Sequence, residues 1–185
     1  MRTQRAGQSA LLLLDAIEVL TREQVGYAIV GAMAASVHGV IRASMDADAL
    51  LSITTAELGN LQMRFKAAGF ATELRRGDME DPIAAVLALR DSFQNRVDLL
   101  VGLRGLEPEA FSRAIAVAFQ GASLRVIGIE DFIAMKVFAG GPKDIADARH
   151  ALLAAKASID TNLLLRLAAR YGRSAAGELK KLLEN

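Results

Sequence analysis

Two aspartates, Asp46 and Asp48, stand one residue apart at the start of an apolar segment that ends near Ile53. Side chains of a β-strand alternate between the two faces of a sheet, so both carboxylates would lie on one face, about 6.6 Å apart along the strand. At an effective dielectric constant of about 20, two such charges repel each other by roughly 2–3 kcal/mol. Either full solvation or a bound cation relieves that repulsion, and the adjoining apolar residues favour a cation.

The segment before these aspartates predicts a strand, a glycine turn and a short helix. Val25–Val30 is apolar and partly β-branched, as in a buried strand, and Gly31 ends it. The alanine-rich segment 32–37 suits a short helix that Gly39 can stop. Backbone N–H groups at the start of a helix attract phosphate, and glycine allows close approach. This pattern therefore predicts a phosphate site next to the two aspartates.

These residues resemble the signature of the DNA polymerase β-type nucleotidyltransferase superfamily, in which Gly-Ser or Gly-Gly after a hydrophobic residue precedes Asp-x-Asp. A longer run is closer to one branch, the small bacterial nucleotidyltransferase-like proteins that include AbiEii-like toxins. That run consists of His38, Gly39, Arg42, Ser44, Asp46 and Asp48. The segments 130–136 and 143–147 also resemble this branch, so the resemblance covers about residues 25–153.

The resemblance implies an α/β (α+β) fold, with a mixed β-sheet flanked by helices and a C-terminal helical extension. We expect residues 1–127 to form the nucleotidyltransferase-like core and residues 128–185 a helical region packed on it. The family also places a third carboxylate on a neighbouring strand, and Asp98, within the expected strand Arg96–Val101, fits that position. Asp46, Asp48 and Asp98 would then be catalytic residues that bind two Mg²⁺ ions, with a nucleoside triphosphate as substrate.

Several other residues are predicted to contact the nucleotide. Lys136 lies on the apolar stripe of an expected helix, where it needs an anionic partner or must extend its ammonium group to water. His38 could touch substrate or could pack and cap the short helix, and the polar segment 75–82, with Arg75 and Arg76, could contact phosphate or form a solvated turn. The predicted nucleotide-binding residues are Gly31, Ala32, Arg42, Ser44, Lys136, Lys143 and Asp144.

The leading functional hypothesis is metal-dependent transfer of a nucleoside monophosphate to an unknown acceptor, RNA, protein or a small molecule. The protein would be the toxin component of a toxin–antitoxin or phage-defence system. Ala32 replaces the usual Ser or Gly, and it has no hydroxyl to donate to phosphate. The alternative is therefore a weakened binding module that acts through an antitoxin-like protein partner or as a homodimer. An unrelated domain that binds a sugar nucleotide is disfavoured, because the short chain has no obvious second substrate domain.

Composition limits the remaining possibilities. The 185 residues include no cysteine, so neither disulfides nor thiolate metal sites are available. A net charge of +1 excludes nucleic-acid binding through overall charge, although not through a local basic patch. Without an apolar run of about 20 residues, a cytoplasmic protein with no membrane contact is expected. Among the secondary elements, Ser9–Arg22 and Glu107–Phe119 each predict one helix.

Overall fold

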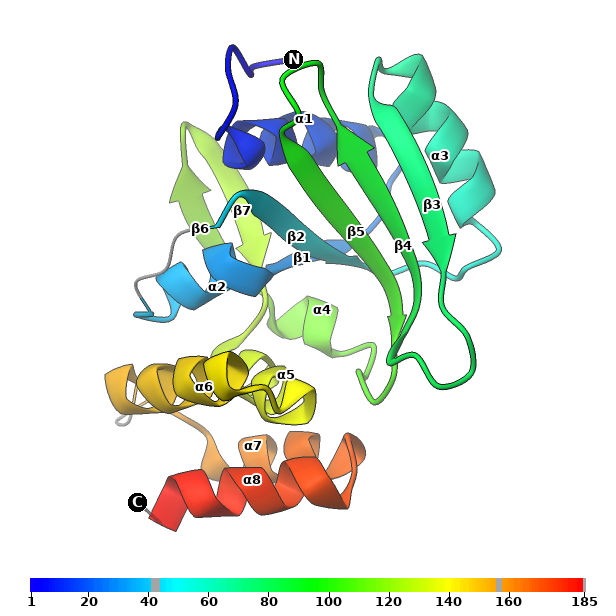
Figure 1. Ribbon diagram of the computed structural model, residues 1–185. Coiled ribbons are helices and arrows are strands. Elements are labelled where there is room, and N and C mark those ends of the chain that lie inside the picture. The colour runs from blue at the N-terminus through cyan, green and yellow to red at the C-terminus, as the bar shows by residue number, and fades with distance from the viewer. Residues whose placement is uncertain (41–43, 156–157, 185) are drawn as a thin grey trace.

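The computed structural model describes residues 1–40, 44–155 and 158–184, and within them seven strands form one mixed sheet (Figure 1). The strands are β1 (Tyr27–Val30), β2 (Asp46–Leu51), β3 (Ala71–Arg76), β4 (Ile83–Arg90), β5 (Arg96–Leu103), β6 (Ile115–Phe119) and β7 (Ala122–Val126). Their order across the sheet is β3-β4-β5-β2-β1-β7-β6. The β2–β5 and β1–β7 pairs are parallel, and the other neighbouring pairs are antiparallel.

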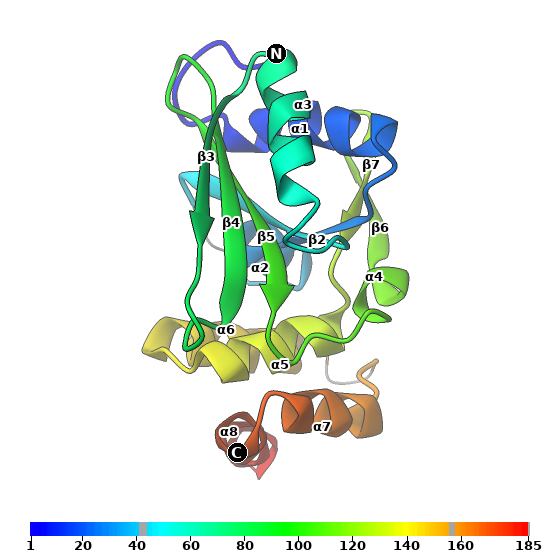
Figure 2. The same ribbon diagram turned by 90° about the vertical axis from the view of Figure 1, so that its right-hand side faces the viewer.

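Helices flank the sheet and gather at one end of it, which confirms the predicted fold class. They are α1 (Ser9–Arg22), α2 (Gly31–Val37), α3 (Leu58–Ala67), α4 (Ala110–Arg113), α5 (Ile129–Ala139), α6 (Pro142–Ala154), α7 (Thr161–Arg170) and α8 (Arg173–Glu184). Figure 2 shows α1 and α3 on one side of β3, β4 and β5, with α5–α8 below the sheet. None of the helices in the described ranges is long and apolar enough to cross a membrane.

The strand sequences decide which face of the sheet packs against α1 and α3. In β5, Val97, Leu99 and Val101 are buried in the apolar core. Because side chains alternate, Asp98 and Leu100 lie on the opposite face. The apolar core runs on into the C-terminal helices, so the division of the chain at residue 127 stays a prediction.

The predicted helix Glu107–Phe119 is wrong in its second half. Only Ala110–Arg113 is helical, and Ile115–Phe119 is the edge strand β6, paired with β7. The two-residue turn between these strands explains the difference, since Gln120 and Gly121 both have positive φ angles, 49° and 79°. Such turns match the twist of antiparallel strands, and they favour a hairpin over continuation of a helix.

A buried ion-pair cluster joins the end of β5 to the C-terminal helices. Glu107 is only 6% exposed and accepts two hydrogen bonds from Arg166 of α7, at 2.6 and 2.9 Å. Arg113 pairs with the same carboxylate at 2.6 Å and also donates to Asp131 of α5 at 2.8 and 2.7 Å. The hydrogen bonds from Arg166, together with the charge and contact of Arg113, lower the pKa of Glu107 to about 2. These contacts fix α5 and α7 beside the sheet.

Candidate active site

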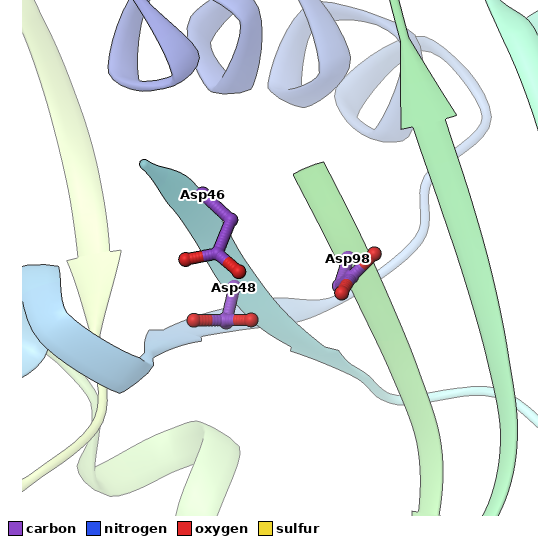
Figure 3. A group of neighbouring side chains, drawn as sticks. All are labelled: Asp46, Asp48 and Asp98. Atoms are coloured by element: carbon purple, nitrogen blue, oxygen red, sulfur yellow. The ribbon is translucent and has the colours of Figure 1, made fainter. Parts of the chain in front are cut away.

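Three aspartates meet on the face of the sheet opposite α1 and α3. Asp46 and Asp48 project from β2, and Asp98 projects from the neighbouring strand β5 (Figure 3). Asp48 and Asp98 are direct partners in the parallel pairing of these strands. Each of the three half-buried side chains offers a carboxylate oxygen, and these oxygens lie within 4.8 Å of one another. The structure therefore brings together all three predicted metal ligands.

Gly31 lies against this group, at the point where β1 ends and α2 begins. Its φ angle is +63°, and a Cβ atom built on it would lie 2.1 Å from Oδ2 of Asp48. Any side chain at this position would collide with the carboxylate and strain the backbone. The same strand register places Val30 opposite Asp48. Glycine is thus required here so that the start of α2 can approach the aspartates.

The donor set fits a divalent cation. Carboxylate oxygens are the ligands that Mg²⁺ prefers, and three acids this close repel one another unless a cation neutralises them. Arg96 supplies part of that charge, because its Nε donates to Oδ1 of Asp98 at 2.8 Å, and this hydrogen bond raises the pKa of the guanidinium group. Sequence reasoning missed Arg96, although its place two residues before Asp98 on one strand was a usable signal.

A pocket of about 160 Å³ opens beside Asp48 and reaches α5 and α6. Gly31, Asp48, Lys136 and Asp144 all line it, so it joins three of the predicted nucleotide-binding residues to the aspartates. Lys136 is tied to α6, because its Nζ lies 2.7 Å from Asp144 and 2.8 Å from Asp147. Asp144 and Asp147 are therefore the anionic partners of this lysine, and they lie next to the phosphate site that the sequence predicts.

A second pocket, of about 280 Å³, lies beside Asp46. Ala32 and Ser44, two further predicted nucleotide-binding residues, line it, and Ser44 Oγ donates to Oδ1 of Asp46. Ser9, at the start of α1, forms another part of the wall. Its Oγ donates to the backbone oxygen of Met45 at 2.6 Å and accepts from the N–H of Arg96 at 3.0 Å. Ser9 thus fixes the starts of β2 and β5 relative to each other.

Other predicted residues lie apart from these pockets. Lys143 is exposed on α6 and lines neither of them, and Arg42 lies outside the described residues. His38 is buried, with Nε2 2.8 Å from the backbone oxygen of Ile127, and burial lowers its pKa. It therefore contacts the connection between β7 and α5. Arg75 and Arg76, predicted in the polar segment 75–82, are the last two residues of β3 and not part of the following loop.

Three solved structures illustrate the similarity of the fold to known proteins. ANT(2")-Ia, in complex with adenylyl-2"-tobramycin, superposes with a TM-score of 0.58 at 16% identity, over 88% of this chain and 98% of that chain. A Thermotoga maritima protein described as a nucleotidyltransferase gives 0.58 at 16% identity, over 82% and 97%. A nucleotidyltransferase-like antigenic protein from Paracoccidioides brasiliensis gives 0.54 at 15% identity, over 98% and 95%. At these identities the likeness shows the fold alone.

A search of curated proteins found no match to this sequence. The family model described as "Nucleotidyltransferase of unknown function (DUF6036)" matches residues 10–182. This match covers nearly the whole chain, including all three aspartates and every residue that lines the pocket beside Asp48. The protein belongs to this family of nucleotidyltransferases.

Proposed function

We propose that the protein transfers a nucleoside monophosphate from a nucleoside triphosphate to a hydroxyl group of an acceptor, with Mg²⁺ as cofactor. One observation carries the proposal, the convergence of Asp46, Asp48 and Asp98 within 4.8 Å beside a glycine that opens α2. A triad of oxygen ligands next to an accessible backbone suits a site that must hold cations and phosphates together.

In this proposal, Asp46, Asp48 and Asp98 would hold two Mg²⁺ ions, the number that the family resemblance implies. When bound there, Mg²⁺ would neutralise phosphate charge and would make the attacking hydroxyl easier to deprotonate. Gly31 lets the phosphates approach the backbone at the start of α2, and Lys136 places a positive charge in the pocket that Asp48 shares. Lys136 and Asp144 together would orient the nucleotide along this pocket.

Ligand-dependent stability tests the proposal directly. Mg²⁺ with at least one of the four ribonucleoside triphosphates should raise the melting temperature, since a ligand that binds only the folded state stabilises it. The double variant Asp46→Asn/Asp48→Asn should lose this shift, and Glu80→Gln, an exposed acid in the β3–β4 connection, should keep it. A wild-type protein that shows no shift with any triphosphate would contradict the proposal.

Ala32 favours a second candidate function, a binding module with weak or no transfer activity. It lies buried at the start of α2 and offers no hydroxyl to phosphate. Such a module would act through an antitoxin-like partner or as a homodimer. A triphosphate-dependent shift without transfer of radiolabel to RNA, protein or small molecules in a cell extract would support it over the enzyme.

The finer assignment to the AbiEii-like toxin branch, acting in the cytoplasm on RNA or protein, rests on the motif resemblance alone. If it holds, expression of the wild-type chain should arrest bacterial growth, and Asp46→Asn/Asp48→Asn should not. Normal growth with the wild-type chain expressed at the same level would remove the toxin role but leave nucleotidyl transfer standing.

A further inference from the structure

Three arginines follow the aspartates across the same face of the sheet. The strand register sets Asp46 opposite Arg96 on β5, and Arg96 opposite Arg90 on β4. Glu73 and Arg75 of β3 share this face, because Ala88 pairs with both Asp98 and Glu73. Figure 1 shows β3, β4 and β5 from this side, with α1 and α3 behind them. We call the surface formed by Arg75, Arg90 and Arg96 the arginine face.

The positive charge of the arginine face is only partly compensated within the protein. Arg90 and Arg96 are direct cross-strand partners, and like charges in that position destabilise a sheet. Glu73 compensates this charge weakly, since it lies 3.9 Å from Nε of Arg75 and 4.0 Å from Arg90. Glu73 and Arg75 are exposed and Arg90 is half-buried, so water screens both ion pairs. If Asp98 binds a cation, less of its negative charge remains to neutralise Arg96. An anion bound on this face would relieve the repulsion.

An exposed aromatic side chain stands at the end of the same two strands. Phe93 lies in the turn that joins β4 to β5, between Arg90 and Arg96 in sequence, and is 42% exposed. Asp91 stabilises the turn, because its carboxylate accepts hydrogen bonds from the backbone N–H of Phe93 at 2.8 Å and of Asn95 at 2.9 Å. Proteins bind single-stranded nucleic acids through basic side chains that contact phosphates and aromatic rings on which bases stack. Phe93 lies three residues along the chain from both Arg90 and Arg96, so the turn carries the aromatic part of such a combination.

We propose that the arginine face binds the phosphodiester backbone of a single-stranded polynucleotide whose terminal hydroxyl is the acceptor. The inference rests on the proposed function and names its acceptor class. A polynucleotide supplies phosphates at regular intervals, bases for Phe93 and a hydroxyl at its end, whereas a phosphopeptide offers no base to stack. A polycationic acceptor would meet the repulsion of Arg75, Arg90 and Arg96.

In the reaction, the terminal hydroxyl oxygen forms a bond to the α-phosphorus of the triphosphate. The bond between this phosphorus and the oxygen that bridges to the β-phosphate breaks. Pyrophosphate leaves with that oxygen, and the hydroxyl proton passes to solvent. The polynucleotide is thereby lengthened by one nucleotide, and no oxidant or reductant is needed.

Binding without chemistry tests the proposal, with the wild-type protein, Mg²⁺ and no triphosphate. Fluorescence anisotropy would measure the Kd of a labelled single-stranded RNA and of a DNA of the same sequence, over a range of salt concentrations. Arg75→Ala/Arg90→Ala should weaken binding at least about tenfold and should make the slope of log K against log salt shallower by about 0.7 per arginine removed. Arg96 stays intact because it contacts Asp98.

Two matched variants separate the contributions. Phe93→Ala should weaken binding about fivefold or more and leave the salt slope unchanged, because stacking releases no counterions. Arg22→Ala/Lys66→Ala removes two exposed charges from α1 and α3, on the other side of the sheet, and should change neither quantity. Equal melting temperatures would show that the variants remain folded.

The outcomes distinguish this inference from the proposed function. Failure of both oligonucleotides to bind, with an intact Mg²⁺–triphosphate shift, would overturn the polynucleotide acceptor and leave nucleotidyl transfer standing. Equal losses in Arg75→Ala/Arg90→Ala and in the α1–α3 control would also overturn it, as would preferential binding of a phosphopeptide. Oligonucleotide binding at the arginine face without any triphosphate shift would instead remove the proposed function.

Discussion

Asp48 on β2 and Asp98 on β5 face each other as direct partners in a parallel strand pair, and their carboxylates leave the sheet on the same side. The chain between them forms α3, β3 and β4, so the two aspartates come together only when β2 and β5 pair in the folded sheet. With Asp46, they concentrate negative charge at one point of the sheet.

Asp46→Asn should make the metal-free protein more stable, because it removes one of three mutually repelling charges. The expected gain is about 1 kcal/mol, or about 2–4 °C in melting temperature for a chain of this size. Saturating Mg²⁺ should reverse the order, since the wild type gains more from the cation. Melting curves in EDTA and in Mg²⁺ check both points, and a variant less stable than the wild type in EDTA would contradict the repulsion argument.

Gly31→Ala should destabilise the protein by about 1–3 kcal/mol, because the new methyl group would meet the carboxylate of Asp48 and the φ angle is positive. The triphosphate-dependent shift should be lost as well. Gly59→Ala is the matched control, since nothing lies within 4 Å of its Cβ position in α3, and it should be neutral or stabilising by up to about 1 kcal/mol. Chemical denaturation measures both variants, and similar costs for the two would argue against the steric explanation.

Lys136→Met should lower stability by about 3 kcal/mol even without nucleotide, because Asp144 and Asp147 would lose the cation that joins α5 to α6. Lys143→Met, an exposed lysine on α6, should change stability by less than about 0.5 kcal/mol. Urea denaturation in the absence of ligand compares the two. Equal stability of the two variants would mean that the Lys136 ion pairs contribute little to the fold.

The stability that Glu107 contributes through its ion pairs with Arg113 and Arg166 should be lost in acid. The pKa of Glu107 is about 2 in the folded protein, compared with 4.5 for an ordinary glutamate, so the folded state favours the ionised form. This contribution to stability is complete above about pH 4.5 and is lost as the pH falls towards 2. Glu107→Gln should therefore be less stable at neutral pH by about 3 kcal/mol and should lose less stability between pH 5 and 3. Parallel pH profiles for the two proteins would contradict this assignment.

Elements with strong local sequence patterns could be predicted from the sequence alone. The helix predicted over Ser9–Arg22 has those bounds, because its apolar residues recur with helical spacing. Strand alternation predicted that Asp46 and Asp48 share a face, and the family resemblance added Asp98 on a neighbouring strand. The predicted nucleotidyltransferase relationship is confirmed by the family match.

Features that depend on distant contacts could not be predicted in the same way. The cross-strand position of Arg90 and Arg96 follows from sheet register, and the partners of Lys136 follow from the packing of α6 on α5. The edge strand β6 was missed because a two-residue turn at Gln120 outweighs the helical spacing before it. Arg166 reaches Glu107 only because the C-terminal helices fold back beside the sheet.

The parallel pairing of β2 with β5 also bears on how the chain is made. A nascent chain that has emerged only as far as β4 already carries Asp46, Asp48 and Gly31, but not the strand that bears Asp98. Cation affinity should therefore rise only after β5 has emerged from the ribosome and docked beside β2. Translation products that end before β5 should therefore lack the cation affinity of the complete aspartate group.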